Sequence, residues 1–423
     1  MKKLLKLTAL VIGLVLAIGF VSCNQGNDAK SDTVDVTVKP GDETDGFPAQ
    51  GALKSIKAVE GVPKVYTAEF EGDYFLDDTI NANLRTSTKL LSYLKTHVRD
   101  WEAEENESSI QINVTGAACS SIVAKNADPE VGGYIYGRNF DWDDGTSLIL
   151  HTKPESGYES VSTCYMGFVS ILNPDWAPND NESNNLLALC CIYVPMDGMN
   201  EKGLYIANLQ NDTDPIVPAG DDTKKYVQTT VAIRYILDKC ATVAEAVEWL
   251  KTINMCPVYA EFPGYPDYHF AIADNSGKYA VVEWIEGEIQ VIESRVVTNH
   301  SLYKQRDTEN NYETYGRYDT LEEFGEAKDW KLDADDVAAA LYEVQQKHSL
   351  WSAVFEPGAK RVTYYFRKAD PTAGITEPEH TGDPEDPEFQ QSEYYEPYID
   401  YLNELHDAKH HPIDYATPVV VQF

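Results

Sequence analysis

The chain has 423 residues, of which 43% are hydrophobic and 24% charged, a composition typical of globular protein. Its formal net charge is −35. A surface that acidic repels the phosphate backbone of nucleic acids, and it argues against binding to anionic membranes through a basic patch. The length is enough for one large domain or two ordinary ones after a leader is removed.

Residues 1–23 have the features of an export signal. Lysines form a charged start, an apolar run follows, and Ser22 precedes Cys23. This ending resembles a bacterial lipobox, so we expect lipidation of Cys23 and a lipid-anchored location in the bacterial cell envelope, on the outer membrane or facing the periplasm. A plain secretory signal and an uncleaved anchor are the alternatives, although the run is short for a membrane span.

The next two segments differ in composition. Residues 24–46 are mostly small and polar, which predicts a flexible linker. Residues 47–118 look more globular, with strand-like alternation over 62–70 and apolar residues at helical spacing from 90 to 101. The segment 47–118 is too small and too weakly apolar for an independent domain, so we expect a pro-segment that packs on the rest.

Strand patterns dominate beyond residue 109. A turn over 126–133 predicts a hairpin, with Cys119 near the start of its first strand and Arg138 near the end of its second. Such hairpins with a few helices indicate an α+β fold of antiparallel sheets with helices on their outer faces. The further predicted elements are, in order, a strand 204–209, helices 227–239 and 242–251, a three-strand meander 268–297, a helix 333–346, a hairpin 350–366, an acidic loop 371–387 and a segment 388–423 that folds back over the body.

Cys119 is a candidate nucleophile because of the segment 137–141, Gly-Arg-Asn-Phe-Asp. A thiol attacks an amide well only as thiolate, and near neutral pH a free thiol is mostly protonated. If Cys119 became the first residue of a mature chain, its α-amine, with a pKa of roughly 7.7–8.0, could act as the base. The hairpin would place the cation of Arg138 and the carboxylate of Asp141 beside it. The alternative is an ordinary turn with a surface salt bridge.

Other motifs are missing from the sequence. It contains no phosphate-binding loop, no zinc-protease helix and no nucleophile elbow. Residues 141–145 lack the ligand register of a calcium loop, and the remaining cysteines show no spacing of a zinc site or a disulfide framework. We therefore expect no metal and no cofactor.

Cys119-Ser-Ser-Ile-Val followed by the segment 137–141 resembles the choloylglycine hydrolase family of N-terminal-nucleophile (Ntn) cysteine amidases. That family includes bile salt hydrolases and penicillin V acylases, with acid ceramidase and N-acylethanolamine acid amidase as relatives. The resemblance covers roughly 119–367. It extends to a turn Asn-Glu-x-Gly-Leu at 200–204, the pair Thr298-Asn299, Arg317 and a closing hairpin at 350–365.

The resemblance implies a fold and a set of roles. The fold is the Ntn-hydrolase four-layer αββα sandwich. Cys119 is the nucleophile, with its own α-amine as base, and Arg138 and Asp141 bracket the thiol and the amine. Asn299 donates a hydrogen bond to the oxyanion of the tetrahedral intermediate, and Arg317 is a supporting cation.

Two departures from the family pattern matter. Bile salt hydrolases place an Asn shortly after the Asn-Glu-x-Gly-Leu turn, and here Asn208 and Gln210 are the candidates for substrate binding. In addition, 118 residues precede Cys119, where typical bile salt hydrolases have little. This implies autoproteolysis between Ala118 and Cys119, a catalytic domain over 119–423, and a pro-segment that stays bound as in the ceramidase branch, forming a heterodimer.

The expected function is therefore that of an exported, lipid-anchored hydrolase of linear amide C–N bonds. Its substrate is a small N-acyl amide, bile-salt-like or fatty-acyl, and the membrane is a partner through the anchor only. One alternative is a non-catalytic surface lipoprotein that binds glycans or peptides, because 11% of the residues are aromatic, including 27 Tyr. Another is an acyltransferase on the same scaffold, which uses an amine acceptor in place of water.

Overall fold

The fold is given by a computed structural model, in which Thr33–Phe423 form one compact unit. The export signal expected over 1–23 and most of the helix expected over 90–101 lie outside the described residues. The structure describes residues 34–37, 48–86, 89–90, 93–94, 118–142, 145–169, 176–179, 182–211, 221–256, 267–285, 287–304, 312–346, 348–367, 375–376, 378, 380–382, 384, 386–410 and 417–423.

An eight-stranded sheet carries the predicted hairpin. Its strands β4 and β5 pair antiparallel, with Cys119 opposite Phe140 and Ser121 opposite Arg138, which confirms the placement expected for the cysteine and the arginine. The order of the sheet is β1 (Val34–Thr37), β19 (Val419–Gln422), β18 (Arg361–Phe366), β17 (Ser349–Glu356), β5 (Tyr134–Asp141), β4 (Ala118–Asn126) and β15 (Val296–Val297), with β16 (Lys331–Leu332) also paired to β4.

A nine-stranded sheet contains the meander and the turn at 200–204. All its neighbouring strands are antiparallel except the pair β3–β6, which is parallel. Its order is β14 (Glu288–Ile292), β13 (Tyr279–Ile285), β12 (Asp267–Ala273), β9 (Tyr205–Asn211), β8 (Asp197–Asn200), β7 (Ser160–Tyr165), β6 (Ser147–Lys153), β3 (Val65–Glu71) and β2 (Lys57–Ala58). Strands β10 (Lys225–Gln228) and β11 (Ile253–Cys256) form a separate parallel pair.

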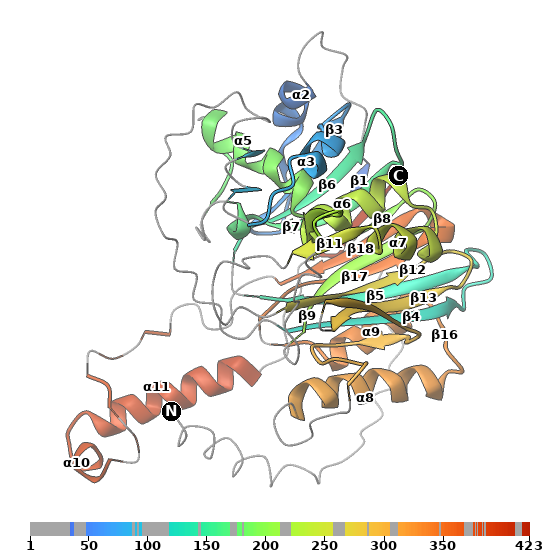
Figure 1. Ribbon diagram of the computed structural model, residues 1–423. Helices are drawn as coiled ribbons and strands as arrows, with labels where there is room; N and C mark the ends of the chain where they lie inside the picture. The colour runs from blue at the N-terminus through green and yellow to red at the C-terminus, as the bar shows by residue number, and fades with distance from the viewer. Residues whose placement is uncertain are drawn as a thin grey trace. The chain divides into compact units, whose positions relative to one another are not determined.

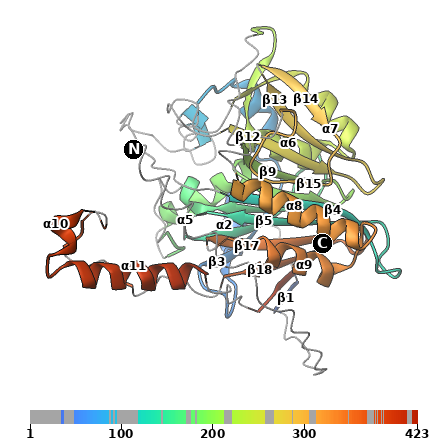
Figure 2. The same cartoon turned by 90° about the horizontal axis from the view of Figure 1, so that it is seen from below.

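Helices cover the outer faces of the two sheets, as Figures 1 and 2 show. Helices α8 (Tyr312–Ala327) and α9 (Ala334–Glu343) pack on the eight-stranded sheet, and α6 (Thr229–Lys239) and α7 (Val243–Leu250) pack on the nine-stranded sheet. Strand β4 faces β9 where the two sheets meet. The expected α+β class and its αββα layering are confirmed. The other α-helices are α2 (Pro48–Ser55), α3 (Leu76–Asn81), α5 (Glu182–Cys190), α10 (Pro387–Gln390) and α11 (Tyr395–His410).

Short-range hydrogen bonds explain where several elements begin and end. Thr242 caps α7 by accepting the backbone N–H of Glu245, and Asp333 forms a capping box at the start of α9. Asn200 organises the turn after β8. Its Oδ1 accepts backbone N–H groups within the turn, and its Nδ2 donates to carbonyl oxygens at the end of α6. The turn is therefore fixed to the helix behind it.

The described part of residues 47–118, the segment expected to be a pro-segment, is built into the nine-stranded sheet. Strand β3 pairs with β6 along its whole length. The buried hydroxyl of Tyr74 donates to Asp238 of α6, and the backbone N–H of Tyr226 donates to Asn83 at 2.7 Å. The segment buries apolar side chains such as Val65 and Phe70 in the common core.

Three features differ from the expectations. Val34–Thr37, expected within a flexible linker, form β1 and pair in parallel with β19, because their alternating valines suit a sheet edge. The last strand of the meander, expected to run to Val297, divides into β14 in one sheet and β15 in the other. The sequence did not predict α8, whose polar and aromatic residues lack a clear apolar stripe.

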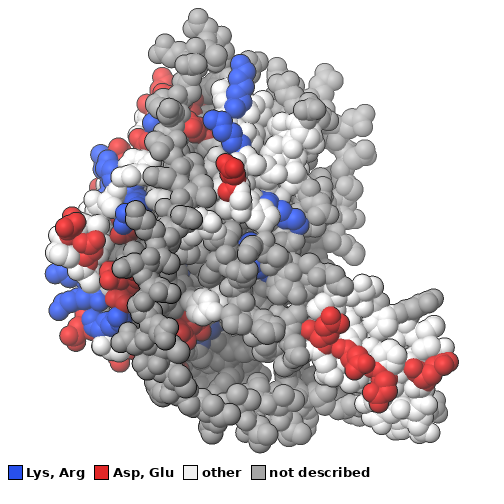
Figure 3. All heavy atoms as spheres, turned by 180° about the vertical axis from the view of Figure 1, so that it is seen from behind, with Lys and Arg blue, Asp and Glu red and all other residues white. Residues whose placement is uncertain are grey.

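The C-terminal segment contributes to the negative charge of the surface. On the face seen in Figure 3, the described side chains over α10 and α11 include several acidic ones and no basic one. Strand β19 follows this segment and pairs antiparallel with β18, so the last residues do return to the body of the molecule.

Candidate active site

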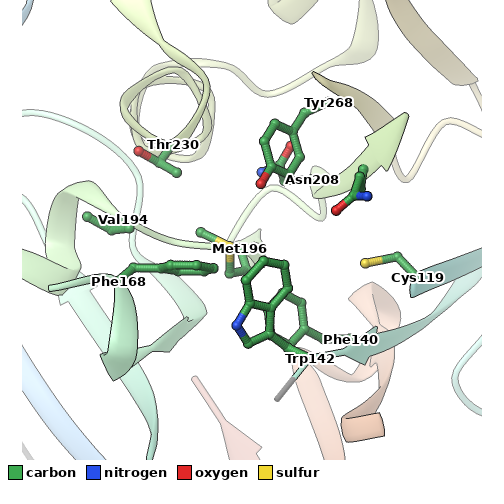
Figure 4. A pocket seen from close by; sticks show the side chains of 10 residues that line it. Cys119, Phe140, Trp142, Phe168, Val194, Met196, Asn208, Thr230 and Tyr268 are labelled. Atoms are coloured by element: carbon green, nitrogen blue, oxygen red, sulfur yellow. The ribbon is translucent and has the colours of Figure 1, made fainter. Parts of the chain in front are cut away.

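Cys119 lies where the two sheets face each other, and its side chain points into a pocket (Figure 4). The residue is only 4% exposed. The pocket holds about 380 Å³ of empty space with its open mouth included. Most of its walls are apolar or aromatic. The lining residues are Cys119, Phe140, Trp142, Phe168, Val194, Met196, Asn208, Gln210, Thr230 and Tyr268.

A fully buried ion pair supports the thiol. Arg138 and Asp197 are both 0% exposed, and Arg138 Nε donates to Asp197 Oδ2 at 2.6 Å. Trp351 Nε1 donates to the same carboxylate oxygen at 3.0 Å, and Arg138 Nη2 donates to the backbone oxygen of Asn208 at 2.8 Å. These contacts hold the guanidinium next to Cys119.

Electrostatics at the thiol act in opposite directions. Burial raises the pKa of Cys119, while the charge of Arg138 and a hydrogen bond from the backbone of Asp141 lower it; the net shift is upward. Burial also lowers the pKa of Arg138, but the charges of Cys119 and Asp197 outweigh burial and hold it above its ordinary value. The guanidinium therefore stays charged, whereas the thiol needs a base to become thiolate.

A second set of contacts holds the backbone of Cys119. Its nitrogen donates to Asn299 Oδ1 at 2.8 Å, and its carbonyl oxygen accepts from Arg317 Nη1 at 2.5 Å. Arg317 also donates to Asn299 Oδ1 at 2.8 Å and to Ser120 Oγ at 2.9 Å. Asn299 Nδ2 donates to the backbone oxygen of Gln210 at 2.8 Å. Asn299 and Arg317 thus fix the position that a free α-amine would occupy.

Asp141 lies on the opposite face of β5 from Arg138. Its Oδ1 accepts from the hydroxyl of Ser349, and its Oδ2 is buried with no hydrogen-bond partner among the described residues. Burial raises the pKa of Asp141 to about 6, against the opposing effects of the Arg317 charge and the Ser349 hydrogen bond. The carboxyl group of Asp141 can therefore pair with the α-amine that cleavage before Cys119 would create.

The structure brings together the five residues predicted to be catalytic. Asn208 and Gln210, the two candidates for substrate binding, both line the pocket. The expected donation from Asn299 to an oxyanion stays a prediction. One N–H of the Asn299 amide already donates to the backbone oxygen of Gln210, and the second N–H could donate to the oxyanion. Asn139, which follows Arg138 in the same motif, donates to the backbone oxygen of Leu341 in α9, on the side away from the pocket.

Sequence reasoning missed several residues of the site. Asp197 stands three residues before Asn200, where the turn motif begins, but nothing in the sequence indicates that it pairs with Arg138. The aromatic and apolar wall that includes Phe168 and Met196 was not predicted either, because these residues come from segments without a recognisable motif. Trp351 was assigned only to the closing hairpin.

Two other features concern binding partners. Among the described residues, no group of three or more His, Cys, Asp or Glu side chains is arranged to hold a metal ion. Within the same residues, no helix is long and apolar enough to cross a membrane.

Comparison with known proteins identifies relatives. Residues 181–339 match the model of the linear amide C-N hydrolases, choloylglycine hydrolase family. A penicillin V acylase of Pectobacterium atrosepticum is 34% identical over 209 residues, which cover 46% of this chain and 52% of that protein. The chain thus spans about half the length of this relative.

Solved structures give looser likenesses. Penicillin V acylase from Agrobacterium tumefaciens is 18% identical, with a TM-score of 0.40 over 59% of this chain and 83% of that one. A variant of conjugated bile acid hydrolase from Clostridium perfringens is 14% identical, with a TM-score of 0.43 over 59% of this chain and 89% of that one. The sequence matches confirm the resemblance predicted by the motifs: the chain is similar to the linear amide C-N hydrolases of the choloylglycine hydrolase family over residues 181–339, and to a penicillin V acylase.

Proposed function

We propose that this protein hydrolyses a linear amide of small-molecule type, with Cys119 as the nucleophile. The observation that carries the proposal is that both the thiol and the backbone nitrogen of Cys119 are held by their surroundings. The Cys119 thiol faces an apolar pocket beside Arg138, while its nitrogen is held by Asn299. A nitrogen fixed in this way is suited to act as a base once it is a free α-amine.

The reaction follows from these positions. The α-amine takes the thiol proton, and the thiolate attacks the carbonyl carbon of the substrate amide. The C–N bond then breaks as the proton passes to the leaving nitrogen, and the acyl group remains on Cys119 as a thioester. Water, deprotonated by the same amine, hydrolyses the thioester and releases the acid. Donors at the pocket, with Asn299 and Asn208 as candidates, stabilise the oxyanion.

This mechanism requires cleavage between Ala118 and Cys119. The thiol attacks the carbonyl carbon of Ala118, the C–N bond breaks as the nitrogen gains a proton, and a thioester links Ala118 to sulfur. Water hydrolyses that thioester, which gives Ala118 a carboxylate and Cys119 its free amine and thiol. The contacts of Arg317 and Asn299 with Cys119 support this step, because they hold the residue in place while its preceding bond breaks.

The pro-segment stays bound after cleavage in this proposal. Its strand β3 lies within the nine-stranded sheet, and the hydrogen bond from Tyr74 to Asp238 is buried. Removing the segment would expose the edge of β6 and the core side chains that β3 covers. The mature protein would thus be a heterodimer.

The pocket favours an apolar acyl group in the substrate. Rings of Phe140, Trp142 and Phe168 flank it, and Val194 and Met196 add aliphatic surface. Aromatic and alicyclic groups pack well on such walls. The substrate class is therefore an N-acyl amide with an aromatic, bile-salt-like or fatty-acyl group, and penicillin V belongs in the test panel because a relative carries that name.

The test combines cleavage with turnover. Wild-type protein should give two fragments under denaturing conditions, one beginning at Cys119, and should release acid from at least one amide of a panel of penicillin V, conjugated bile salts and N-acylethanolamines. Cys119→Ala should remain a single chain and be inactive, and Cys119→Ser should cut slowly because a hydroxyl is the weaker nucleophile. Active protein with the Ala118–Cys119 bond intact would show that the Ntn mechanism is wrong.

A lipid anchor at Cys23 completes the proposal. It rests on the charged start, the apolar run and the Ser22-Cys23 ending of the leader. Metabolic labelling with a clickable fatty acid should mark the wild type in the membrane fraction and leave Cys23→Ala unmarked. Equal labelling of the two proteins would contradict the anchor.

A further inference from the structure

We propose that His269 and Glu283, a buried pair outside the pocket, position the turn that carries Asn299 and thereby set the place of the Cys119 nitrogen. The inference rests on the proposed function, because it concerns the same nitrogen. Neither residue touches Cys119 in the structure, so both act through Asn299 as positioning residues.

His269 connects two neighbouring strands to the turn. It lies on β12, the strand whose Tyr268 lines the pocket, and both His269 and Glu283 are 0% exposed. Its Nε2 lies 2.8 Å from the backbone oxygen of Thr298, and its Nδ1 lies 3.1 Å from Glu283 Oε1 on β13. Thr298 directly precedes Asn299, so the imidazole holds the peptide next to the amide that binds Cys119.

Glu283 holds the other end of the same turn. Its Oε1 accepts the backbone N–H of Leu302 at 2.7 Å, and its Oε2 accepts the hydroxyl of Ser301 at 2.7 Å and the backbone N–H of Tyr303 at 3.2 Å. The carboxylate therefore receives hydrogen bonds from three donors, and the imidazole of His269 is its fourth polar neighbour. A carboxylate surrounded in this way is ionised. Burial raises its pKa, but the hydrogen bond and charge of His269 outweigh burial, and the pKa is lowered to about 2.

The partners of the imidazole fix its protonation. A backbone carbonyl and an ionised carboxylate are both acceptors only, so both ring nitrogens of His269 must carry a hydrogen for the two contacts to be hydrogen bonds. His269 is then an imidazolium paired with Glu283 inside the protein. Removing one member of such a pair leaves the other buried and uncompensated, which loosens the whole turn.

A chain of hydrogen bonds connects the turn to Cys119. Thr298 Oγ1 donates to the backbone oxygen of Thr314, the backbone N–H of Asn299 donates to Thr314 Oγ1, and Asn299 Oδ1 then accepts from the Cys119 nitrogen. A shift of about 1 Å at a reacting group can reduce turnover on the order of 10²-fold. The pair is therefore expected to affect kcat and to leave KM nearly unchanged.

Two substitutions separate the two hydrogen bonds of His269. His269→Gln places an amide near the Nε2 position and keeps a donor for Thr298, whereas His269→Asn reaches only the Nδ1 position and keeps a donor for Glu283. We expect His269→Asn to lower kcat on the order of 10²-fold, with KM within about twofold, and His269→Gln to retain more activity than His269→Asn. In wild-type protein, ¹⁵N NMR should show both ring nitrogens of His269 protonated at neutral pH.

A matched control and an independent measurement make the test decisive. His151 is also buried and also pairs with a glutamate, Glu159, at 2.5 Å, but it lies on β6 and does not line the pocket, so His151→Asn should retain wild-type kcat. The rate of Cys119 alkylation against pH reports the thiol without any amide substrate. Its profile should shift in folded His269→Asn and not in His151→Asn.

The outcomes are distinct. An unchanged kcat and an unchanged alkylation profile in folded His269→Asn would overturn the proposal, and so would an NMR signal of a singly protonated His269 ring in the wild type. If His269→Asn does not fold, His269→Gln and the NMR measurement still decide it. If wild-type protein hydrolyses no amide, the proposed function fails, while the alkylation profile continues to test the positioning role.

Discussion

The two sides of Cys119 are built in different ways. Its thiol side depends on Arg138, which lies on the adjacent strand of the same hairpin and is 0% exposed. Its nitrogen side depends on Asn299 and Arg317, which are 180 and 198 residues away in the chain and arrive from a turn and from helix α8. Strand register alone therefore places the cation at the thiol, whereas the nitrogen is held only after two distant segments dock.

The charges on the two sides also differ. Arg138 is neutralised by Asp197 at 2.6 Å and shielded from solvent. Arg317 binds the carbonyl oxygen of Cys119 and the amide oxygen of Asn299, and its charge draws the nearby carboxyl of Asp141 toward ionisation. The thiol side is thus a closed ion pair, while the nitrogen side has a carboxyl group that can still gain or lose a proton.

The largest expected effect comes from breaking the thiol side. Asp197→Asn leaves Arg138 as a buried charge without its partner, which should lower the free energy of unfolding by about 3–5 kcal/mol. Urea unfolding of the purified proteins measures the change. The control is Glu248→Gln, which removes a solvent-exposed ion pair with Lys251 and should change the free energy by less than about 1 kcal/mol. Equal stability of Asp197→Asn and wild type would show that the pair is not needed.

Breaking the nitrogen side should affect rate more than stability. Asn299→Ala removes the acceptor for the Cys119 nitrogen and a candidate oxyanion donor, so turnover should fall by about 10²–10³-fold in correctly cleaved protein. Steady-state kinetics with the best amide of the panel measure this. Asn139→Ala is the control, since that amide binds Leu341 on the far face of the sheet. A rate unchanged in Asn299→Ala would mean that the amide is purely structural.

The smallest effect concerns Asp141 and pH. Its pKa is raised from 3.8 to about 6 in the folded protein, so the folded state holds this proton more tightly than the unfolded chain does. The contribution of Asp141 to the free energy of unfolding is therefore largest below about pH 4 and falls by about 3 kcal/mol as pH rises to about 6 and above.

Asp141→Asn should remove that contribution while Asn Oδ1 still accepts from Ser349. Unfolding curves at pH 4, 5, 6 and 7 should show that the stability of the variant relative to wild type rises across this range. A constant difference between the two proteins at all four pH values would contradict the raised pKa.

The local sequence pattern was enough to predict the hairpin that places Arg138 near the Cys119 thiol. Alternating residues and a polar turn predicted the hairpin, and the register of a hairpin follows from its turn, so Cys119 and Arg138 could be placed together. The caps of α7 and α9 were predictable for the same reason, because their donors and acceptors lie within four residues. The positions of Asn299 and Arg317 came from resemblance to a family and not from any local pattern.

Only the tertiary structure decided which buried groups meet. Between β14 and β15 the chain crosses from one sheet to the other, which brings Asn299 close to Cys119. The alternation of apolar residues alone would allow the same residues to continue as one strand. Likewise, neither Asp197 beside Arg138 nor His269 beside Glu283 has a signature of its own. Periodicity specifies which face of an element is buried, but the partner of a buried charge depends on how two sheets pack against each other.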